Sequence, residues 1–177
     1  MVVVICSIVI LYMVAEQRMN ELPAAAERAN FYALLEQVKT GINFEMITHV
    51  ASGNYNGLNN LEGANPMDFL LDQPRNYRGE LDQVTDRNTT RRSWYFETST
   101  GELVYVVGGP SIADVFVTIG GIPVNLGQLR FRLVNVYEET DTGSAPGQMG
   151  RSRWQGLQLV PTRQFEWERR AETPVEI

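Results

Sequence analysis

Residues 1–15 read MVVVICSIVILYMVA, and this apolar run, with the helical pattern that follows it, decides the expected fold. No charged side chain appears before Glu16. A helix needs about 20 apolar residues to cross the hydrocarbon core of a bilayer, so the run is short for a span. Three interpretations are open: a membrane anchor, a secretory signal peptide, and a buried core strand or helix.

The flanks of the run favour the anchor. A signal peptide has a basic segment before its apolar run and a small-residue cleavage site soon after it. Here no basic residue precedes the run, and Ala24–Ala26 come only after a charged stretch. We therefore expect residues 1–15 to be a single-pass membrane anchor, and the strand-rich C-terminal part favours export of the domain that follows it. The anchor residues are Val2, Val3, Val4, Ile5, Ile8, Val9, Ile10 and Leu11.

Residues 16–50 predict one amphipathic helix, because apolar residues recur at spacings of three and four. The stripe consists of Met19, Leu22, Ala26, Ala29, Leu34, Leu35, Val38, Ile42, Met46 and Val50. Glu27, Arg28, Glu36 and Lys39 are expected mostly off it, and Pro23 is expected to kink or restart the helix. The stripe could pack on the chain's own sheet, which is the commoner case, or on other helices of an assembly. The interface residues are Leu22, Leu34, Leu35, Val38 and Ile42.

Residues 51–177 predict an antiparallel sheet domain. Residues 51–63 read as a loop, a short helix is expected around 67–71, and residues 74–88 look polar and irregular. Alternation then predicts strands at 94–97, 102–107, 115–119 and 128–138, with one or two short strands at 154–160 and 164–168. The expected fold class is therefore α+β: a long N-terminal apolar and amphipathic helix packed on a small antiparallel β-sheet.

The composition argues against several kinds of chemistry. The 177 residues include 21 acidic and 15 basic ones, and this net charge of −6 disfavours nucleic-acid binding. Cys6 and His49 are the only residues of their types, and no metalloprotease, dithiol or serine-hydrolase motif occurs. We expect no catalysis, no cofactor and no small-molecule substrate. His49 is expected to cap a helix end or to lie on the surface near it. A weak calcium candidate is the acidic group Glu138, Glu139 and Asp141, although a solvated strand end is favoured.

Several short stretches together resemble the type IV pilin and pseudopilin group. They look like stretches of pilin-related proteins encoded with MSHA-type pilus biogenesis and type II secretion systems, and the resemblance covers about residues 1–140. The stretches are Leu61–Met67 (LEGANPM), Pro74–Tyr77 (PRNY), Gly79–Glu80, Ser93–Thr98 (SWYFET) and Gly101–Tyr105 (GELVY). The family's Gly-Phe-Thr-Leu-Ile-Glu type processing motif is missing, and the apolar run has no acidic residue, so the glutamate with which that family registers its subunits cannot be assigned.

The resemblance implies a pilin-like fold and a non-enzymatic structural or assembly role in a pilus or secretion system. It also implies that the anchor lies in the inner membrane with the C-terminal domain in the periplasm. The implied partners are the membrane and other proteins of that machine. The alternative is a membrane-tethered periplasmic binding module unrelated to filaments, and an envelope hydrolase is a third, disfavoured class.

Overall fold

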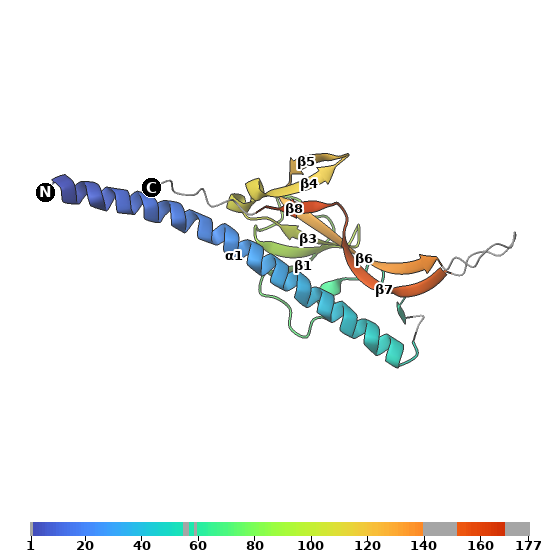
Figure 1. Cartoon of the computed structure of the whole chain (residues 1–177). Coiled ribbons are helices and arrows are strands. Elements are labelled where there is room, and N and C mark those ends of the chain that lie inside the picture. Colours follow the sequence, from blue (N-terminus) through green and yellow to red (C-terminus); the bar gives the residue numbers. More distant parts are fainter. Residues whose placement is uncertain (1, 55–56, 59, 140–151, 169–177) are drawn as a thin grey trace.

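A single long helix runs along one side of the molecule and joins a β-rich domain (Figure 1). The computed structural model describes residues 2–54, 57–58, 60–139 and 152–168, with the backbone alone for residues 2–23, 139 and 152–153. Helix α1 spans Val2–Ala51, which is 50 residues, and is continuous through Pro23. At 1.5 Å per residue this helix is about 75 Å long. Its N-terminal half extends beyond both sheets (Figure 1).

The strands form two sheets. The larger sheet has the order β1-β2-β3-β6-β7, and the smaller has the order β5-β4-β8. The bounds are β1 Tyr77–Leu81, β2 Ser93–Glu97, β3 Glu102–Val106, β4 Val115–Ile119, β5 Ile122–Asn125, β6 Gln128–Glu139, β7 Ser152–Pro161 and β8 Phe165–Trp167. Two short 3₁₀ helices, η1 (Pro66–Phe69) and η2 (Gly109–Asp114), complete the described elements. Strands β1 and β2 are parallel, whereas all the other pairs are antiparallel.

The expectation of one small antiparallel sheet, and of a pilin-like fold with it, was wrong. The chain is mixed α+β, with a five-stranded sheet that contains a parallel pair and a separate three-stranded sheet. Strand β1 lies in the stretch 74–88 that was expected to be irregular. It was missed because a short parallel edge strand has neither a long apolar run nor a hairpin turn to mark it.

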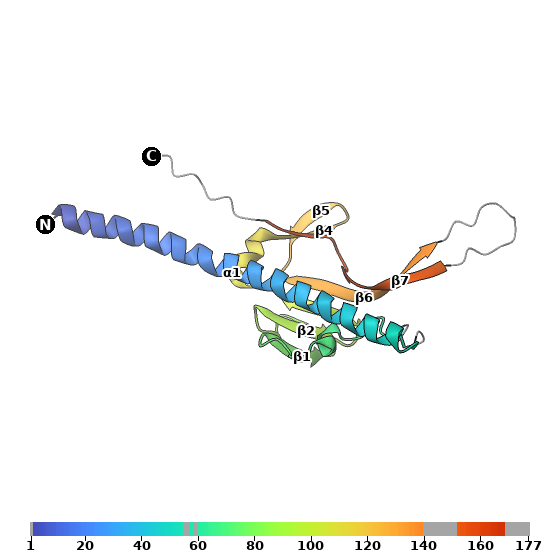
Figure 2. The ribbon, with the colours of Figure 1, turned by 60° about the horizontal axis from the view of Figure 1, so that its bottom comes forward.

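Helix α1 lies across the five-stranded sheet (Figure 2), and both sheets contribute to the core beneath it. Phe31 of α1 is 1% exposed, and its ring lies 5.4 Å from that of Trp94 on β2 and 5.0 Å from that of Trp167 on β8. Because those strands belong to different sheets, Phe31 joins the two sheets through the helix. A smaller apolar cluster on the opposite face of the large sheet contains Val84, Tyr95, Val104 and Val106.

The predicted apolar stripe of α1 is buried from Leu34 to Ile42, whereas its last member, Val50, is exposed, and the side chains of Met19 and Leu22 lie outside the described residues. Leu34, Leu35, Val38 and Ile42 are all buried. In the preceding turns, however, Ala26 and Ala29 are exposed, whereas Glu27 and Phe31 face the core. Alanine is small enough for either the buried or the exposed side of a helix, so Ala26 and Ala29 indicated the wrong buried side. Glu27 was left out of the stripe because its side chain is charged.

The small sheet is built on the β4–β5 hairpin. Ile119 pairs with Ile122 across Gly120 and Gly121, which have φ values of +59° and +83°. A two-residue turn with positive φ at both positions matches the right-handed twist of the strands and favours glycine. Strand β5 is an edge strand and contains Pro123, which pairs with Thr118.

Replacing Phe31 by alanine should lower the free energy of unfolding by about 3–5 kcal/mol, because a buried aromatic ring is lost and a cavity remains. Phe44→Ala is a matched control on the same helix, since Phe44 is 68% exposed. Urea unfolding followed by tryptophan fluorescence measures both. Equal losses for the two variants would contradict the shared core described above.

Candidate functional site

Four hydrogen bonds converge on the carboxylate of Glu27, whose side chain is only 2% exposed. Oε1 accepts from the Tyr105 hydroxyl at 3.0 Å and from the Gly108 N–H at 2.6 Å. Oε2 accepts from the Ser111 hydroxyl at 2.7 Å and from Nε of Arg92 at 3.1 Å. The donors come from β3, from η2 and the residue before it, and from the residue before β2. The carboxylate thus ties α1 to three separate segments of the domain.

The backbone around this carboxylate is shaped to admit it. Among the described residues, Arg92 is the only non-glycine residue with a positive φ, of 61°. This left-handed conformation costs about 1–2 kcal/mol, so the surrounding contacts must hold it in place. A Cβ atom at Gly108 would overlap Oε2 of Glu27 and crowd Arg92. Burial and the neighbouring Glu27 carboxylate raise the pKa of Tyr105 above its ordinary value of 10, so its hydroxyl keeps the proton that it donates.

A second charged cluster lies on the far face of the large sheet. Arg130 of β6 donates to Glu97 of β2 and, at 2.9 Å, to Glu102 of β3. Glu97 also accepts from the Val84 N–H at 2.6 Å and from the Thr100 hydroxyl at 2.8 Å. These groups are partly buried, so the ion pairs are less screened than exposed ones.

The pKa of Glu97 reflects this setting. Burial raises it, but the bonds from Arg130, Val84 and Thr100 outweigh burial, and the net pKa lies below the ordinary value of 4.5. Burial likewise disfavours the Arg130 cation, yet the two carboxylates raise the pKa of Arg130 overall. Glu97 and Arg130 are therefore both charged at neutral pH.

A cleft of about 660 Å³ opens beside this cluster. Its floor includes Glu102, Gln128 and Arg130 of the large sheet. Apolar residues of η2, β4 and the β5–β6 connection also line it. Further polar lining residues come from the β1–β2 and β7–β8 connections. The apolar side is Ile112, Val117 and Leu126, and the polar side includes Asp86, Thr89, Arg91, Thr162 and Arg163. No motif in the sequence announced this cleft, because its residues come from six separate stretches of chain.

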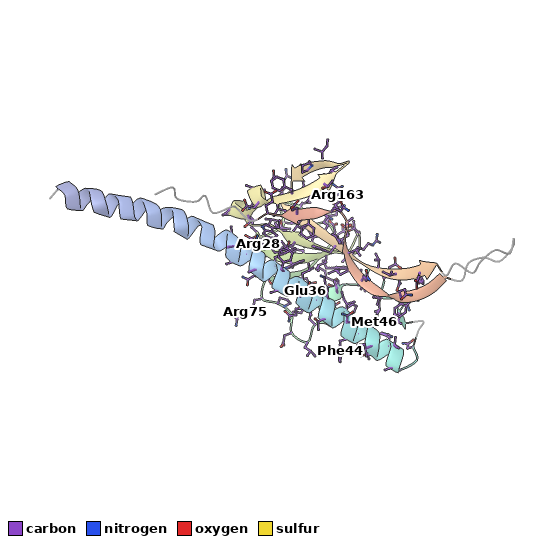
Figure 3. The ribbon with its side chains drawn as sticks, in the orientation of Figure 1. Arg28, Glu36, Phe44, Met46, Arg75 and Arg163 are labelled. Carbon is purple, nitrogen blue, oxygen red and sulfur yellow. The ribbon has the colours of Figure 1, made fainter. Side chains whose placement is uncertain are left out.

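The outer side of α1 carries large apolar residues near its C-terminal end. Phe44 is 68%, Ile47 61% and Val50 40% exposed. They follow one another at spacings of three, so they fall on neighbouring parts of the helix surface. Figure 3 shows Phe44 on the side of α1 turned away from the sheets, whereas Met46 lies against the domain. Several apolar side chains left in solvent close together are typical of an interaction surface.

The sequence-predicted residues have different outcomes. Leu34, Leu35, Val38 and Ile42 pack in the chain's own core, which was the commoner of the two interpretations. The side chain of Leu22 and those of the predicted anchor (Val2, Val3, Val4, Ile5, Ile8, Val9, Ile10 and Leu11) lie outside the described residues, although their backbone is helical. Among the described residues, no helix is long and apolar enough to cross a membrane.

The calcium candidate is described only in part. Glu138 accepts a hydrogen bond from the Gln155 side chain. The side chain of Glu139 and all of Asp141 lie outside the described residues. His49 lies in the last turn of α1, with Nε2 3.3 Å from Oε1 of Glu45, and its carbonyl accepts bonds from Ser52 and Asn54.

The sequence analysis missed three features: the four hydrogen bonds to the Glu27 carboxylate, called the Glu27 clamp below, the Glu97–Arg130–Glu102 cluster, and the cleft. One signal could have found the first. Glu27 lies four residues before Phe31 and seven before Leu34, which is the spacing of one helix face. The other two depend on cross-strand contacts between distant parts of the sequence. Comparisons with protein-family models, with curated proteins and with solved structures find no match for this chain.

Replacing Glu27 by alanine should lower the free energy of unfolding by about 3 kcal/mol, because the buried Tyr105 and Ser111 hydroxyls and the Gly108 N–H lose their acceptor. Glu36→Ala is the matched control, since Glu36 is exposed and pairs only with Lys39 at 2.7 Å. That change should cost less than about 0.5 kcal/mol. Urea denaturation of both variants measures the difference, and similar small losses would show that the clamp contributes little.

The depressed pKa of Glu97 predicts a loss of stability in acid. A carboxyl whose pKa is lower when folded binds fewer protons in the folded state than in the unfolded state. Its contribution is complete above the unfolded pKa, near 4.5, and is lost as the pH falls through the folded value. Urea midpoints measured between pH 7 and pH 2 should therefore fall more steeply for the wild type than for Glu97→Gln. Parallel profiles would contradict the assignment.

Proposed function

We propose that this chain is a non-enzymatic, membrane-anchored assembly component of a type IV (MSHA-like) pilus or a type II secretion system. The observation that carries the proposal is the form of α1. This helix is one unbroken element of 50 residues whose second half is bound to the domain while its first half extends beyond it. A helix of this form can place one end among partner helices or lipid while holding the domain at a fixed position.

The rigid attachment supports this role. Residues 31–42 of α1 are fixed by the apolar core, and Glu27 adds directional hydrogen bonds at the point where the helix leaves the domain. Movement of the projecting half would therefore be transmitted to the sheets rather than absorbed at a joint. The resemblance to pilins and pseudopilins supports the choice of machine.

The exposed apolar residues of α1 suggest where a partner helix binds. Phe44 and Ile47 are exposed on the same helix as the projecting half. One long partner helix could therefore contact these two residues and the projecting half. A neighbouring helix would remove these side chains from water, and each fully buried side chain of this size contributes about 1.5–3 kcal/mol.

The second candidate is a membrane-tethered periplasmic binding module unrelated to filaments. The cleft of about 660 Å³ favours it, because clefts of roughly 300–1,000 Å³ are the usual size for small-molecule sites. The two functions predict different partners, so one co-purification experiment distinguishes them.

The chain should co-purify with pilus or secretion-system proteins from detergent-solubilised native membranes, with the partners identified by mass spectrometry. Replacing Phe44 and Ile47 together by serine should reduce that recovery by several fold, since their apolar contacts are lost. The control variant replaces Glu36 and Thr40, exposed residues of the same helix, by serine. Both variants should keep the wild-type free energy of unfolding to within about 0.5 kcal/mol, because exposed positions contribute little to the core.

Recovery of a membrane protein without such partners would favour the binding module. Recovery in the soluble fraction would contradict the anchor as well. Equal recovery for the two serine variants would place the interface elsewhere on the chain.

A further inference from the structure

The cleft beside the Glu97–Arg130–Glu102 cluster contains guanidinium groups that the domain does not use. Among the described residues, Arg163 makes no hydrogen bond or ion pair, and its side chain is exposed. The side chain of Arg91 makes one bond, from Nη1 to the Val107 carbonyl at 3.3 Å, which leaves its other guanidinium N–H groups free. Figure 3 places Arg163 beside strands β4 and β8.

The carboxylates of the cleft are mostly occupied. Glu102 accepts from Arg130 at 2.9 Å and from the Thr162 hydroxyl at 3.0 Å. Asp86 is the one acidic lining residue that makes no such bond among the described residues. Arg130 is held by Glu97 and Glu102, so three arginines stand against three carboxylates and the cleft has no net excess of charge. What favours a ligand with an anionic group is that the guanidinium groups of Arg163 and Arg91 keep free N–H donors.

The lining of the cleft also includes apolar residues, and they continue into an exposed apolar strip on the small sheet. Val117 of β4 is 3% exposed and lines the cleft. Ile119 points to the same side of β4, because side chains two residues apart share a face. Their partners on β5 are Val124 and Ile122, and the three outer residues, Ile119, Ile122 and Val124, are all exposed. A ligand that reaches from the arginines along these residues would meet a continuous apolar strip.

We propose that this cleft is a binding site for a small organic anion with an apolar body. Arg163 and Arg91 hold the carboxylate, sulfonate or phosphate, for which the planar guanidinium fork is suited. The apolar body lies against Ile112, Val117 and Leu126. Arg130 stays paired with Glu97 and Glu102 and forms the floor. The site does not depend on the assembly role, since it lies on the face of the large sheet opposite α1.

The probe for the test is 8-anilinonaphthalene-1-sulfonate, an apolar ring system with one sulfonate. The full chain is titrated with it and fluorescence gives the Kd. Arg163→Gln and Arg91→Gln should each raise the Kd about fivefold, the effect of losing one partly exposed ion pair. Arg75→Gln is the matched control, because Arg75 is an exposed arginine on the loop before β1 and lies below α1 in Figure 3.

Two further measurements separate the cleft from other apolar surfaces. Phe44→Ser should leave the Kd of the sulfonate unchanged, since Phe44 is on the outer side of α1. The neutral analogue N-phenyl-1-naphthylamine should bind wild type and Arg163→Gln equally. The proposal is overturned if Arg163→Gln weakens sulfonate binding no more than Arg75→Gln does, or if the neutral analogue loses affinity to the same extent. Unfolding midpoints equal to that of the wild type show that the variants are folded.

Discussion

The carboxylate of Glu27, buried between α1, strand β3 and the η2 segment, constrains how the helix lies on the domain. Apolar contacts such as those of Phe31 and Val38 favour burial but have little directional preference, so alone they tolerate small shifts along the helix. A carboxylate with four donors at 2.6–3.1 Å does not tolerate such shifts. Any displacement would leave polar groups buried without partners, which costs more than the apolar contacts can recover. The apolar contacts and the Glu27 hydrogen bonds together therefore fix how α1 lies on the domain.

The two faces of the large sheet use different chemistry. The face toward α1 is closed by aromatic rings, with Phe31 stacked on Trp94. The far face combines a small apolar cluster with two neighbouring carboxylates, Glu97 and Glu102, which Arg130 bridges. The first face gives cohesion and orientation, whereas the second leaves a charged and partly open surface. This separation explains how one domain could serve an assembly through its helix and still offer a cleft to a ligand.

Much of the secondary structure could be predicted from the sequence, because local patterns are strong where strands alternate. Strand β6 and the β2–β3 hairpin agree with the prediction to within about two residues, the usual uncertainty of such boundaries. The arrangement of the strands could not be predicted. Strand β8 pairs with β4 across some 50 residues of chain, and nothing local marks such a pairing. The candidate sites were missed for the same reason, since Glu97 and Arg130, or Glu27 and Ser111, meet only in the folded chain.

The proline in the β4–β5 hairpin limits how copies of this protein can meet. An open sheet edge normally offers a row of N–H and C=O groups that can recruit a strand from another molecule. Pro123 has no N–H to offer, and β5 is only four residues long, so few donors remain at this edge. Unwanted stacking of one domain on the next through β5 is thereby discouraged, despite the exposed isoleucines of the same hairpin. A crowded array of these domains could then remain ordered by its helices rather than merge into a continuous β-structure.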